Sequence, residues 1–332
     1  RKLFHSVFII KSSFFLQNMT KTPLIGLTIN ELKEVVNSLK MPSFTAKQIA
    51  EWIYQKKVLT IDDMTNISKK NRLVLSEKYC VGRCDFSHEA ISIDGTKKYL
   101  FPTTNGYIES VFIPEDDRAT LCVSCQVGCK MNCQFCMTGK QGFVGNLTAG
   151  GIIILVLSFA DSNRFLTVVF DGNLTAGEII NQVLSIPDSN KLTNIVFMGM
   201  GEPMDNISHL LNSIEILTSD YGLNWSPKRI TVSSVGLIPG LKLFLEKTQC
   251  HLAISLHNPI AHEREAMMPA EKAYPITKII KFLKEYDFAH QRRLSFEYTL
   301  FKGENDTPRH VNELVKLLKG IPCRVNIIRY HE

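Results

Sequence analysis

Two stretches near the start of the chain repeat apolar side chains at the spacing of a helix. They cover residues 32–39 and 49–53, and Pro42 lies between them. This period of three to four residues predicts two amphipathic helices, which are separate because proline does not continue a helix. A capping box is expected to begin each helix: Thr28-x-x-Glu31 and Thr45-x-x-Gln48. Residues 19–85 are therefore predicted to form a small helical domain.

Residues 86–121 change to the pattern of β-strands. Asp94-Gly95 and Asn105-Gly106 each separate two runs of apolar or β-branched residues. Both dipeptides favour the type I′ turn that joins two antiparallel strands. This segment is predicted to be a β-hairpin lead-in to the region that begins at residue 122.

From residue 122 to the end at residue 332, short apolar runs alternate with helical patterns. The strand candidates are TNIVFMGMGEP, KRITVSSVG, CHLAISLH, LSFEYTLF and RVNIIRY. Such alternation predicts an α/β fold with a parallel sheet or barrel, because parallel neighbours need a crossover connection that is usually a helix.

A tandem repeat interrupts this region. Residues 145–171 and 172–198 are near-copies, and each reads as one helix followed by one strand. The second copy keeps a capping box, Thr175-x-x-Glu178, whereas Gly151 replaces the glutamate in the first copy. We therefore predict that the second copy belongs to the fold and that 145–171 is a dispensable insertion.

The composition indicates a phosphate-rich partner and no membrane-spanning segment. The chain of 332 residues is 45% hydrophobic and 21% charged, as in soluble globular proteins. Its formal net charge is +6, and the excess of lysine and arginine lies within residues 1–84. Such a surface suits a phosphate-rich partner, although a merely solvated basic face is the alternative. No run approaches the about 18 consecutive apolar residues of a membrane span, so we expect no membrane partner. The protein is expected to be a cytoplasmic monomer.

Residues 1–18 form an N-terminal extension that does not belong to the predicted helical domain. They are basic and then apolar, as in a signal peptide, but their longest apolar run spans only Val7 to Ile10. No small-residue cleavage site follows, and a methionine stands at position 19. The segment is interpreted as upstream sequence, with a targeting segment as the alternative.

The cysteines are unevenly distributed. More than half of the nine crowd into one short stretch, whereas a secreted disulfide framework would spread them. Cys129-x-x-x-Cys133-x-x-Cys136 places three thiolates on one loop, which can hold three irons of a [4Fe–4S] cluster and leave the fourth iron open. Zinc is the alternative, because Cys122-x-x-Cys125 and Cys133-x-x-Cys136 form zinc-ribbon-like pairs, but zinc leaves Cys129 without a role.

This cysteine spacing, with Phe135 between its last two members, resembles the signature of the radical S-adenosylmethionine enzymes. The resemblance implies a partial (βα)6 barrel, truncated at its C-terminus, with a [4Fe–4S] cluster and S-adenosylmethionine (SAM) as cofactors. Cys129, Cys133 and Cys136 would ligate the cluster, and the open iron would bind SAM. An electron from a donor such as a flavodoxin then cleaves SAM to a 5′-deoxyadenosyl radical.

Later motifs occur in the order expected for the same family. Gly199-Met200-Gly201-Glu202-Pro203 resembles the GGEP-type element that holds the methionyl amino group. Ser233 and Ser255-Leu256-His257 end two further predicted strands, and ligands bind at the carboxyl ends of parallel strands. His331 stands where the family commonly has an asparagine that contacts SAM. The implied SAM site consists of Gly201, Glu202, Ser233, Ser255, Leu256, His257 and His331, with a core role as the alternative for His257.

Residues 107–143 form the most specific block. They are similar to the dual-specificity ribosomal and transfer RNA adenine-C2 methyltransferases, and the match runs from Met19 to Glu332 apart from the repeat. The resemblance implies an enzyme that methylates carbon 2 of adenine in 23S rRNA and tRNA. Two alternatives stay open: the sister methyltransferase that acts on carbon 8, and a non-catalytic, zinc-bearing RNA-binding module.

The family reacts at an electron-poor carbon by first placing the methyl group on a cysteine and then activating it with a radical. By motif, Glu109 would accept the ring proton, and Cys122 would release the product by forming a disulfide with the methyl-carrying cysteine. A solvated glutamate and a buried thiol are the alternatives for these two residues. The methyl carrier lies in a GDDI-x-x-ACGQL-like segment of the family, which has no counterpart here. The chain is therefore expected to stop before it and to cleave SAM without methylating RNA.

Overall fold

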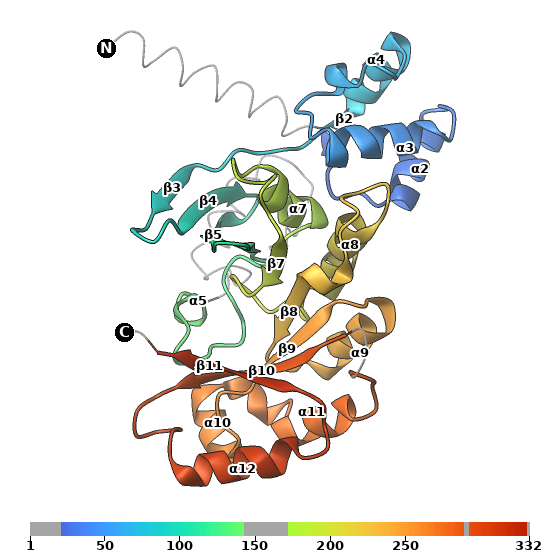
Figure 1. Ribbon diagram of the computed structural model, residues 1–332. Helices are drawn as coiled ribbons and strands as arrows, with labels where there is room; N and C mark the ends of the chain where they lie inside the picture. Colours follow the sequence, from blue (N-terminus) through green and yellow to red (C-terminus); the bar gives the residue numbers. More distant parts are fainter. Residues whose placement is uncertain (1–20, 143–171, 289–291, 331–332) are drawn as a thin grey trace, which may run out of the picture. The chain divides into compact units, whose positions relative to one another are not determined.

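The computed structural model describes residues 21–142, 172–288 and 292–330 (Figure 1). Their contacts form two compact units, each described by itself. The helical unit comprises 21–86, 175–190 and 208–226, and the sheet unit comprises the other described residues.

Three predictions fall on residues that lie outside this description. They concern the extension 1–18, the first repeat copy 145–171 and His331. Each of them stays a prediction.

The first helix of the helical unit, α2 (Ile29–Ser38), begins at its predicted capping box. The Glu31 N–H donates to the Thr28 hydroxyl at 3.4 Å, and the Thr28 N–H donates to Glu31 Oε2 at 2.7 Å. The predicted amphipathic face is confirmed, since Leu32 is buried whereas Lys33 is exposed.

The second predicted capping box was wrong. Helix α3 (Thr45–Ala50) begins with Phe44 at its N-cap, and no side chain caps it. The Thr45 N–H donates to the Pro42 carbonyl at 3.0 Å, and the Thr45 side chain is buried. The turn after Pro42 therefore places Thr45 one residue inside the helix, where its hydroxyl cannot act as the cap.

The other elements of the helical unit are short. They are β1 (Thr22–Pro23), η1 (Glu51–Gln55), η2 (Ile61–Asp63), α4 (Lys69–Lys78), β2 (Tyr79–Cys80), α7 (Ala176–Leu184) and most of α8 (Ile207–Thr218). The strands β1 and β2 pair in parallel.

Helix α7 comes from the second repeat copy and begins at the predicted capping box of Thr175 and Glu178. Asn181 on this helix exchanges two hydrogen bonds with the backbone of Cys84, at 3.0 and 2.8 Å. The first copy has Ile154 at the equivalent position, which could make neither bond. The second copy therefore supplies a contact that the first copy lacks.

The sheet unit is built on a sheet of nine strands in the order β11-β10-β9-β8-β7-β6-β5-β4-β3. The strands are β3 (His88–Ile91), β4 (Lys97–Thr103), β5 (Gly106–Pro114), β6 (Ala119–Cys122), β7 (Asn194–Phe197), β8 (Ile230–Ser234), β9 (His251–Ser255), β10 (Leu294–Leu300) and β11 (Arg324–Arg329). Strands β3 to β6 pair antiparallel, which confirms both predicted hairpins.

Strands β6 to β11 pair in parallel and in chain order. This is the strand arrangement of a (βα)6 sheet, and all five strand candidates are strands. The α/β fold class is therefore confirmed. The helices of this unit are α5 (Met137–Lys140), α9 (Ile238–Lys247), α10 (Ala261–Met267), α11 (Ile276–Leu283) and α12 (Pro308–Leu318), with short turns η3 (Pro227–Arg229) and η4 (Pro269–Lys272). Among the described residues, no helix is both long and apolar enough to span a membrane.

The two faces of the parallel sheet differ in chemistry. Residues paired across neighbouring strands share a face, and residues alternate between faces along each strand. One face is apolar and buried, with Leu121, Ile195, Val232, Ile254 and Phe296. The opposite face, called here the polar face, carries Thr120, Cys122, Asn194, Thr231, Ser233, His251, Ser255, Ser295, Glu297 and Asn326. Side chains that can hydrogen-bond a ligand are therefore concentrated on the polar face.

Candidate active site

The loops that follow β6 and β7 lie side by side. The Cys125 N–H donates to the Met200 carbonyl at 2.9 Å, and the Gly199 N–H donates to the Val123 carbonyl at 3.1 Å. The Ser124 hydroxyl accepts from the Met200 N–H at 2.9 Å. The cysteine loop, defined as residues 123–136, is therefore joined to the GMGEP loop at the carboxyl ends of two neighbouring strands.

Cys129, Cys133 and Cys136 lie on the cysteine loop as free thiols. Burial raises the pKa of Cys129 to about 11 and that of Cys133 to about 12, and the neighbouring thiols add to both shifts. The Cys136 N–H donates to the Cys133 carbonyl at 3.1 Å, so a tight turn joins these two cysteines. All nine cysteines of the chain are free, so no disulfide stands in this structure.

This donor set fits a [4Fe–4S] cluster. Thiolates are the ligands that such a cluster takes, and three of them on one loop leave one iron open. In the described part of the chain, no three His, Cys, Asp or Glu side chains converge as ligands of a metal ion. A four-iron cluster spreads its thiolates around a body larger than one ion, so it does not need that convergence.

Phe135 connects the cysteine loop to residues that follow three other strands. Its ring meets the ring of His257 in an edge contact with centroids 4.8 Å apart, and lies 5.6 Å from Phe301. The Phe301 ring in turn lies 4.8 Å from Tyr330. Phe135 is thus packed against residues that follow β9 and β10, and Phe301 extends this aromatic cluster to the residue after β11.

His257 follows β9 in a left-handed backbone conformation, with a φ of 53°. Its Nδ1 accepts from the Thr299 N–H at 3.0 Å, and its carbonyl accepts from the Asn305 side chain at 2.6 Å. Burial lowers the pKa of His257 to about 3, so its ring is neutral at physiological pH. Because Nδ1 accepts, the proton lies on Nε2, which is left as a donor.

The Glu202 carboxylate is buried and bonded to the backbone of two loops. Oε1 accepts from the Met204 N–H at 3.1 Å, and Oε2 accepts from the Val235 N–H at 2.9 Å. The Glu202 N–H donates to Gln126 Oε1 at 2.8 Å. The side chain therefore ties the GMGEP loop to the end of β8, and the part of this loop left for a ligand is its backbone.

Gly201 keeps that backbone bare. Its φ is +99°, and a Cβ on it would lie 2.5 Å from the Gln126 Cβ, which is closer than real carbon atoms approach. Only glycine fits here, and a glycine lets a ligand come close to the main chain.

Replacing Glu202 by glutamine is expected to make stability less dependent on pH. Burial raises the pKa of Glu202 from 4.5 to about 7, so the folded state keeps a proton that the unfolded state has released. The natural protein therefore loses stability as the pH rises from 4.5 to 7, by about 3 kcal/mol from this group. An amide does not titrate and shows no such loss. Urea unfolding of both proteins between pH 4 and 8 measures the difference, and parallel curves would contradict the account.

Ser233 and Ser255 both lie on the polar face and are half-buried. The neighbouring Ser234 lies on the opposite face, where its hydroxyl accepts from the Gly236 N–H at 2.9 Å and bonds Glu202. Leu256 is buried. The structure thus places Ser233 and Ser255 on one face, and Ser234 on the other face beside Glu202.

Glu109 and Cys122 lie on β5 and β6, on the extension of the same polar face. Val111 pairs with Cys122, so Glu109 is two residues further along that face. Glu109 forms an ion pair of 3.0 Å with Lys98, and its side chain is 45% exposed. Burial raises the pKa of the Cys122 thiol to about 11. The two predicted catalytic side chains are therefore an accessible carboxylate and a protonated thiol on one face.

A buried ion pair between Arg264 on α10 and Glu271 was not predicted from the sequence. The Arg264 side chain is fully buried. Its guanidinium donates to the carbonyls of Val235 at 3.1 Å, Ser255 at 2.8 Å and Leu256 at 3.0 Å, and to the Glu271 carboxylate. The pair thus fastens the ends of β8 and β9, where the candidate SAM residues lie. Its helix reads AHEREAM, which looks like a solvated helix, so no signal was available in the sequence.

Glu297 on β10 was also missed. It is buried on the polar face beside Ser255, and burial raises its pKa. Its Oε1 accepts from the Asn326 side chain at 2.8 Å and from the Ser295 hydroxyl at 3.2 Å. The signal was present here, since Glu297 is the single acid in the apolar run LSFEYTLF.

Comparison with known proteins agrees with this geometry. The family model of the ribosomal RNA large subunit methyltransferase N-terminal domain matches residues 22–81, and that of the radical SAM superfamily matches 123–318. A probable dual-specificity RNA methyltransferase RlmN of Phocaeicola vulgatus is 55% identical, over 94% of this chain and 82% of its own length.

More distant relatives agree as well. The dual-specificity RNA methyltransferase RlmN of Desulfosudis oleivorans is 36% identical over 98% of this chain and 82% of its own length. A crystal structure of a radical SAM methyltransferase from Sphaerobacter thermophilus matches with a TM-score of 0.78 at 36% identity, over 92% of this chain and 84% of that chain. The chain therefore belongs to the RlmN family of the radical SAM superfamily.

Proposed function

We propose that this protein is a radical SAM methyltransferase that acts on carbon 2 of adenine in 23S rRNA and tRNA. The observation that carries the proposal is the pairing of the three-cysteine loop with the GMGEP loop at the carboxyl ends of β6 and β7. Membership of the RlmN family supports the RNA substrate.

The cofactors of this proposal are a [4Fe–4S] cluster and SAM. Cys129, Cys133 and Cys136 would hold the cluster as thiolates, since free and neighbouring thiols are what it requires. Bound together, cluster and SAM supply a carbon-centred radical. The protein's own part is to exclude water: Phe135, packed against His257 and Phe301, keeps the cluster end of the site apolar.

The SAM site of this proposal lies at the strand ends and on the polar face. Gly201 offers bare backbone, Ser233 and Ser255 offer hydroxyls, and His257 offers Nε2–H. Glu202 and Leu256 would support the site without contacting SAM. The Glu202 side chain joins two loops, and the Leu256 carbonyl accepts a hydrogen bond from Arg264. His331, outside the described residues, completes the proposed site.

Two residues of the polar face would handle protons and the thiol step. Glu109 is accessible and charged, so it can accept the proton of the adenine ring. Burial raises the pKa of Cys122 to about 11 and keeps this thiol protonated. Cys122 would form a disulfide with the methyl-carrying cysteine as the product leaves.

The remaining parts of the proposal follow from charge and chemistry. The basic segment 19–85 would contact RNA phosphates. A flavodoxin-like donor would supply the electron, and free thiols and a cluster suit a reducing compartment such as the cytoplasm. The protein would act as a monomer.

Mass spectrometry of RNA nucleosides tests the proposed function. No ACGQL-like segment occurs in the 332 residues, so the test joins them to the C-terminal segment of a relative. With SAM, reductant and unmodified tRNA or 23S rRNA, we expect 2-methyladenosine. Cys122→Ala in the same protein should accumulate a covalent protein–RNA adduct, because the thiol that releases the product is absent. Formation of 8-methyladenosine would contradict the proposal and select the carbon-8 sister activity, and zinc in place of iron would select a non-catalytic module.

A further inference from the structure

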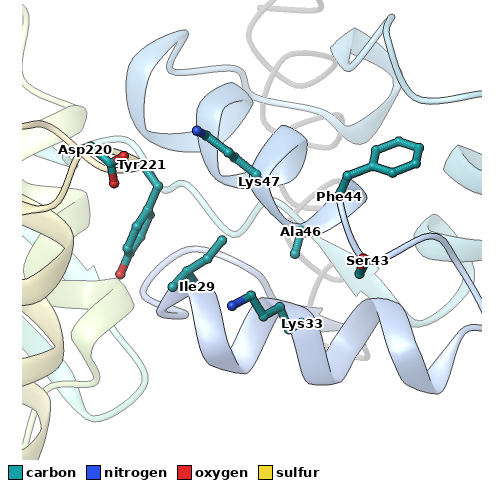
Figure 2. A pocket seen from close by; sticks show the side chains of 8 residues that line it. All are labelled: Ile29, Lys33, Ser43, Phe44, Ala46, Lys47, Asp220 and Tyr221. Atoms are coloured by element: carbon teal, nitrogen blue, oxygen red, sulfur yellow. The ribbon is translucent and has the colours of Figure 1, made fainter.

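The helical unit contains a cavity of about 410 Å³, and none of the residues proposed for the cluster or SAM sites lines it (Figure 2). It is lined by residues of α2, of the start of α3 and of the segment that follows α8. Ile29, Ala46 and Tyr221 supply apolar lining, and the hydroxyl of Tyr221 donates to Glu215 at 2.8 Å. Such a lining suits the flat, apolar face of a ring more than a hydrated ion.

Two cations line the same cavity. Lys33 on α2 and Lys47 on α3 are exposed. Within the described part of the chain, neither lysine forms an ion pair or a side-chain hydrogen bond, and Asp220, the one carboxylate of the lining, is not paired with them. Lys57 of the same unit, by contrast, donates to Asn190 at 2.6 Å. The cavity thus presents two positive charges that are not neutralised by the fold.

An exposed aromatic ring completes the set. Phe44 is 65% exposed and also lines the cavity. It stands at the N-cap of α3, on the turn in which the Thr45 N–H donates to the Pro42 carbonyl at 3.0 Å. The backbone is therefore fixed while the ring faces solvent, so stacking on the ring requires little ordering of the protein.

We propose that this pocket binds an unpaired nucleotide of the RNA substrate. The base stacks on the ring of Phe44, and Lys33 and Lys47 contact the phosphates beside it. Stacking on an exposed aromatic ring next to cations is how proteins hold single-stranded RNA, because every base has a π-face and every linkage a negative charge. This inference rests on the proposed function and adds a site outside the residues proposed for the radical chemistry.

Fluorescence anisotropy with an unmodified tRNA transcript tests the pocket through two separable signatures. Phe44→Leu keeps an apolar side chain but removes the π-face, so it should weaken binding by about 5- to 100-fold, as loss of one stacked base does. The salt dependence of binding should stay unchanged, and Phe44→Trp should restore affinity. The double variant Lys33→Ala/Lys47→Ala should instead lower the slope of log affinity against log salt by about 1 to 2.

Matched controls lie outside the cavity. Leu73→Ala on α4 removes an apolar side chain that is 56% exposed, and Lys278→Ala/Lys281→Ala on α11 removes two exposed lysines outside the basic segment 19–85. Both should bind tRNA as the unchanged protein does, and circular dichroism should show all variants folded. If the α11 lysine pair lowers the salt slope as much as the cavity pair, the basic charge acts without a site and the proposal is wrong.

The outcomes separate this inference from the function on which it rests. If the protein binds tRNA and Phe44→Leu binds equally well, the pocket proposal fails while the proposed function stands. If the unchanged protein does not bind tRNA at all, the proposal that RNA is the substrate is wrong. If polyglutamate displaces tRNA from the unchanged protein but not from the Lys33/Lys47 variant, the pocket takes an acidic peptide, which also overturns the proposal.

Discussion

Alanine at Cys129, Cys133 or Cys136 is expected to leave the protein without its iron–sulfur cluster. Three protein thiolates are the minimum that leaves one iron open for SAM, so none of them can be spared. After anaerobic reconstitution we expect about four irons and four sulfides per unchanged chain. The alanine variants should retain little iron and show no charge-transfer absorbance, and SAM cleavage should fall below detection.

Cys125 provides the matched control. It lies on the same loop and is buried, but its thiol donates to the Met200 carbonyl at 3.6 Å and is not part of the three-cysteine spacing. Cys125→Ser replaces the thiol by a smaller hydroxyl that can still donate a hydrogen bond. This variant should keep the full iron content. Loss of iron from Cys125→Ser together with retention in Cys129→Ala would show that the ligand set was assigned wrongly.

Arg264→Met is expected to be the most destabilising single change outside the cysteine loop. It leaves the Glu271 carboxylate buried without its cation, and removal of one partner of a buried pair costs about 3–5 kcal/mol. The carbonyls of Val235, Ser255 and Leu256 also lose their donor. Since these carbonyls end β8 and β9, we expect SAM binding to weaken as well as stability to fall.

Urea unfolding measures the effect, and Arg309→Met is the control. Arg309 bonds Glu263 at 3.2 Å, but its side chain is 62% exposed, and exposed pairs contribute about 0–1 kcal/mol. Glu271→Gln keeps Arg264 and removes the negative charge, so it should destabilise the protein through the same network. Equal unfolding midpoints for Arg264→Met and Arg309→Met would show that the buried pair does not hold the strand ends.

The features that could be predicted from the sequence are those that depend on the period of apolar residues and on the spacing of motifs. The strands were predicted because short apolar runs alternate with helical patterns along the chain. This alternation also predicted that the strands pair in parallel. The motifs predicted that the GMGEP loop and the cysteine loop belong to one site. The hydrogen bond from the Cys125 N–H to the Met200 carbonyl shows that the two loops are neighbours. Features that repeat along the chain were thus readable without coordinates.

Features that depend on side-chain direction were not readable. The run TVSSVG contains two serines, and only the strand register assigns Ser233 to the polar face and Ser234 to Glu202. A capping box at Thr45 was predicted by spacing, but the turn after Pro42 moved this residue inside the helix. Arg264 had no signal at all, since a charged residue on a short helix is usually solvated. Tertiary contacts decide each of these cases.

Production of 5′-deoxyadenosine is the decisive test of radical SAM chemistry in this protein. The protein, reconstituted anaerobically with iron and sulfide, is mixed with SAM and dithionite, and the products are quantified by liquid chromatography and mass spectrometry. We expect 5′-deoxyadenosine and methionine in equal amounts, with none from Cys133→Ala. A protein that holds its full complement of iron and SAM but forms no 5′-deoxyadenosine would contradict it.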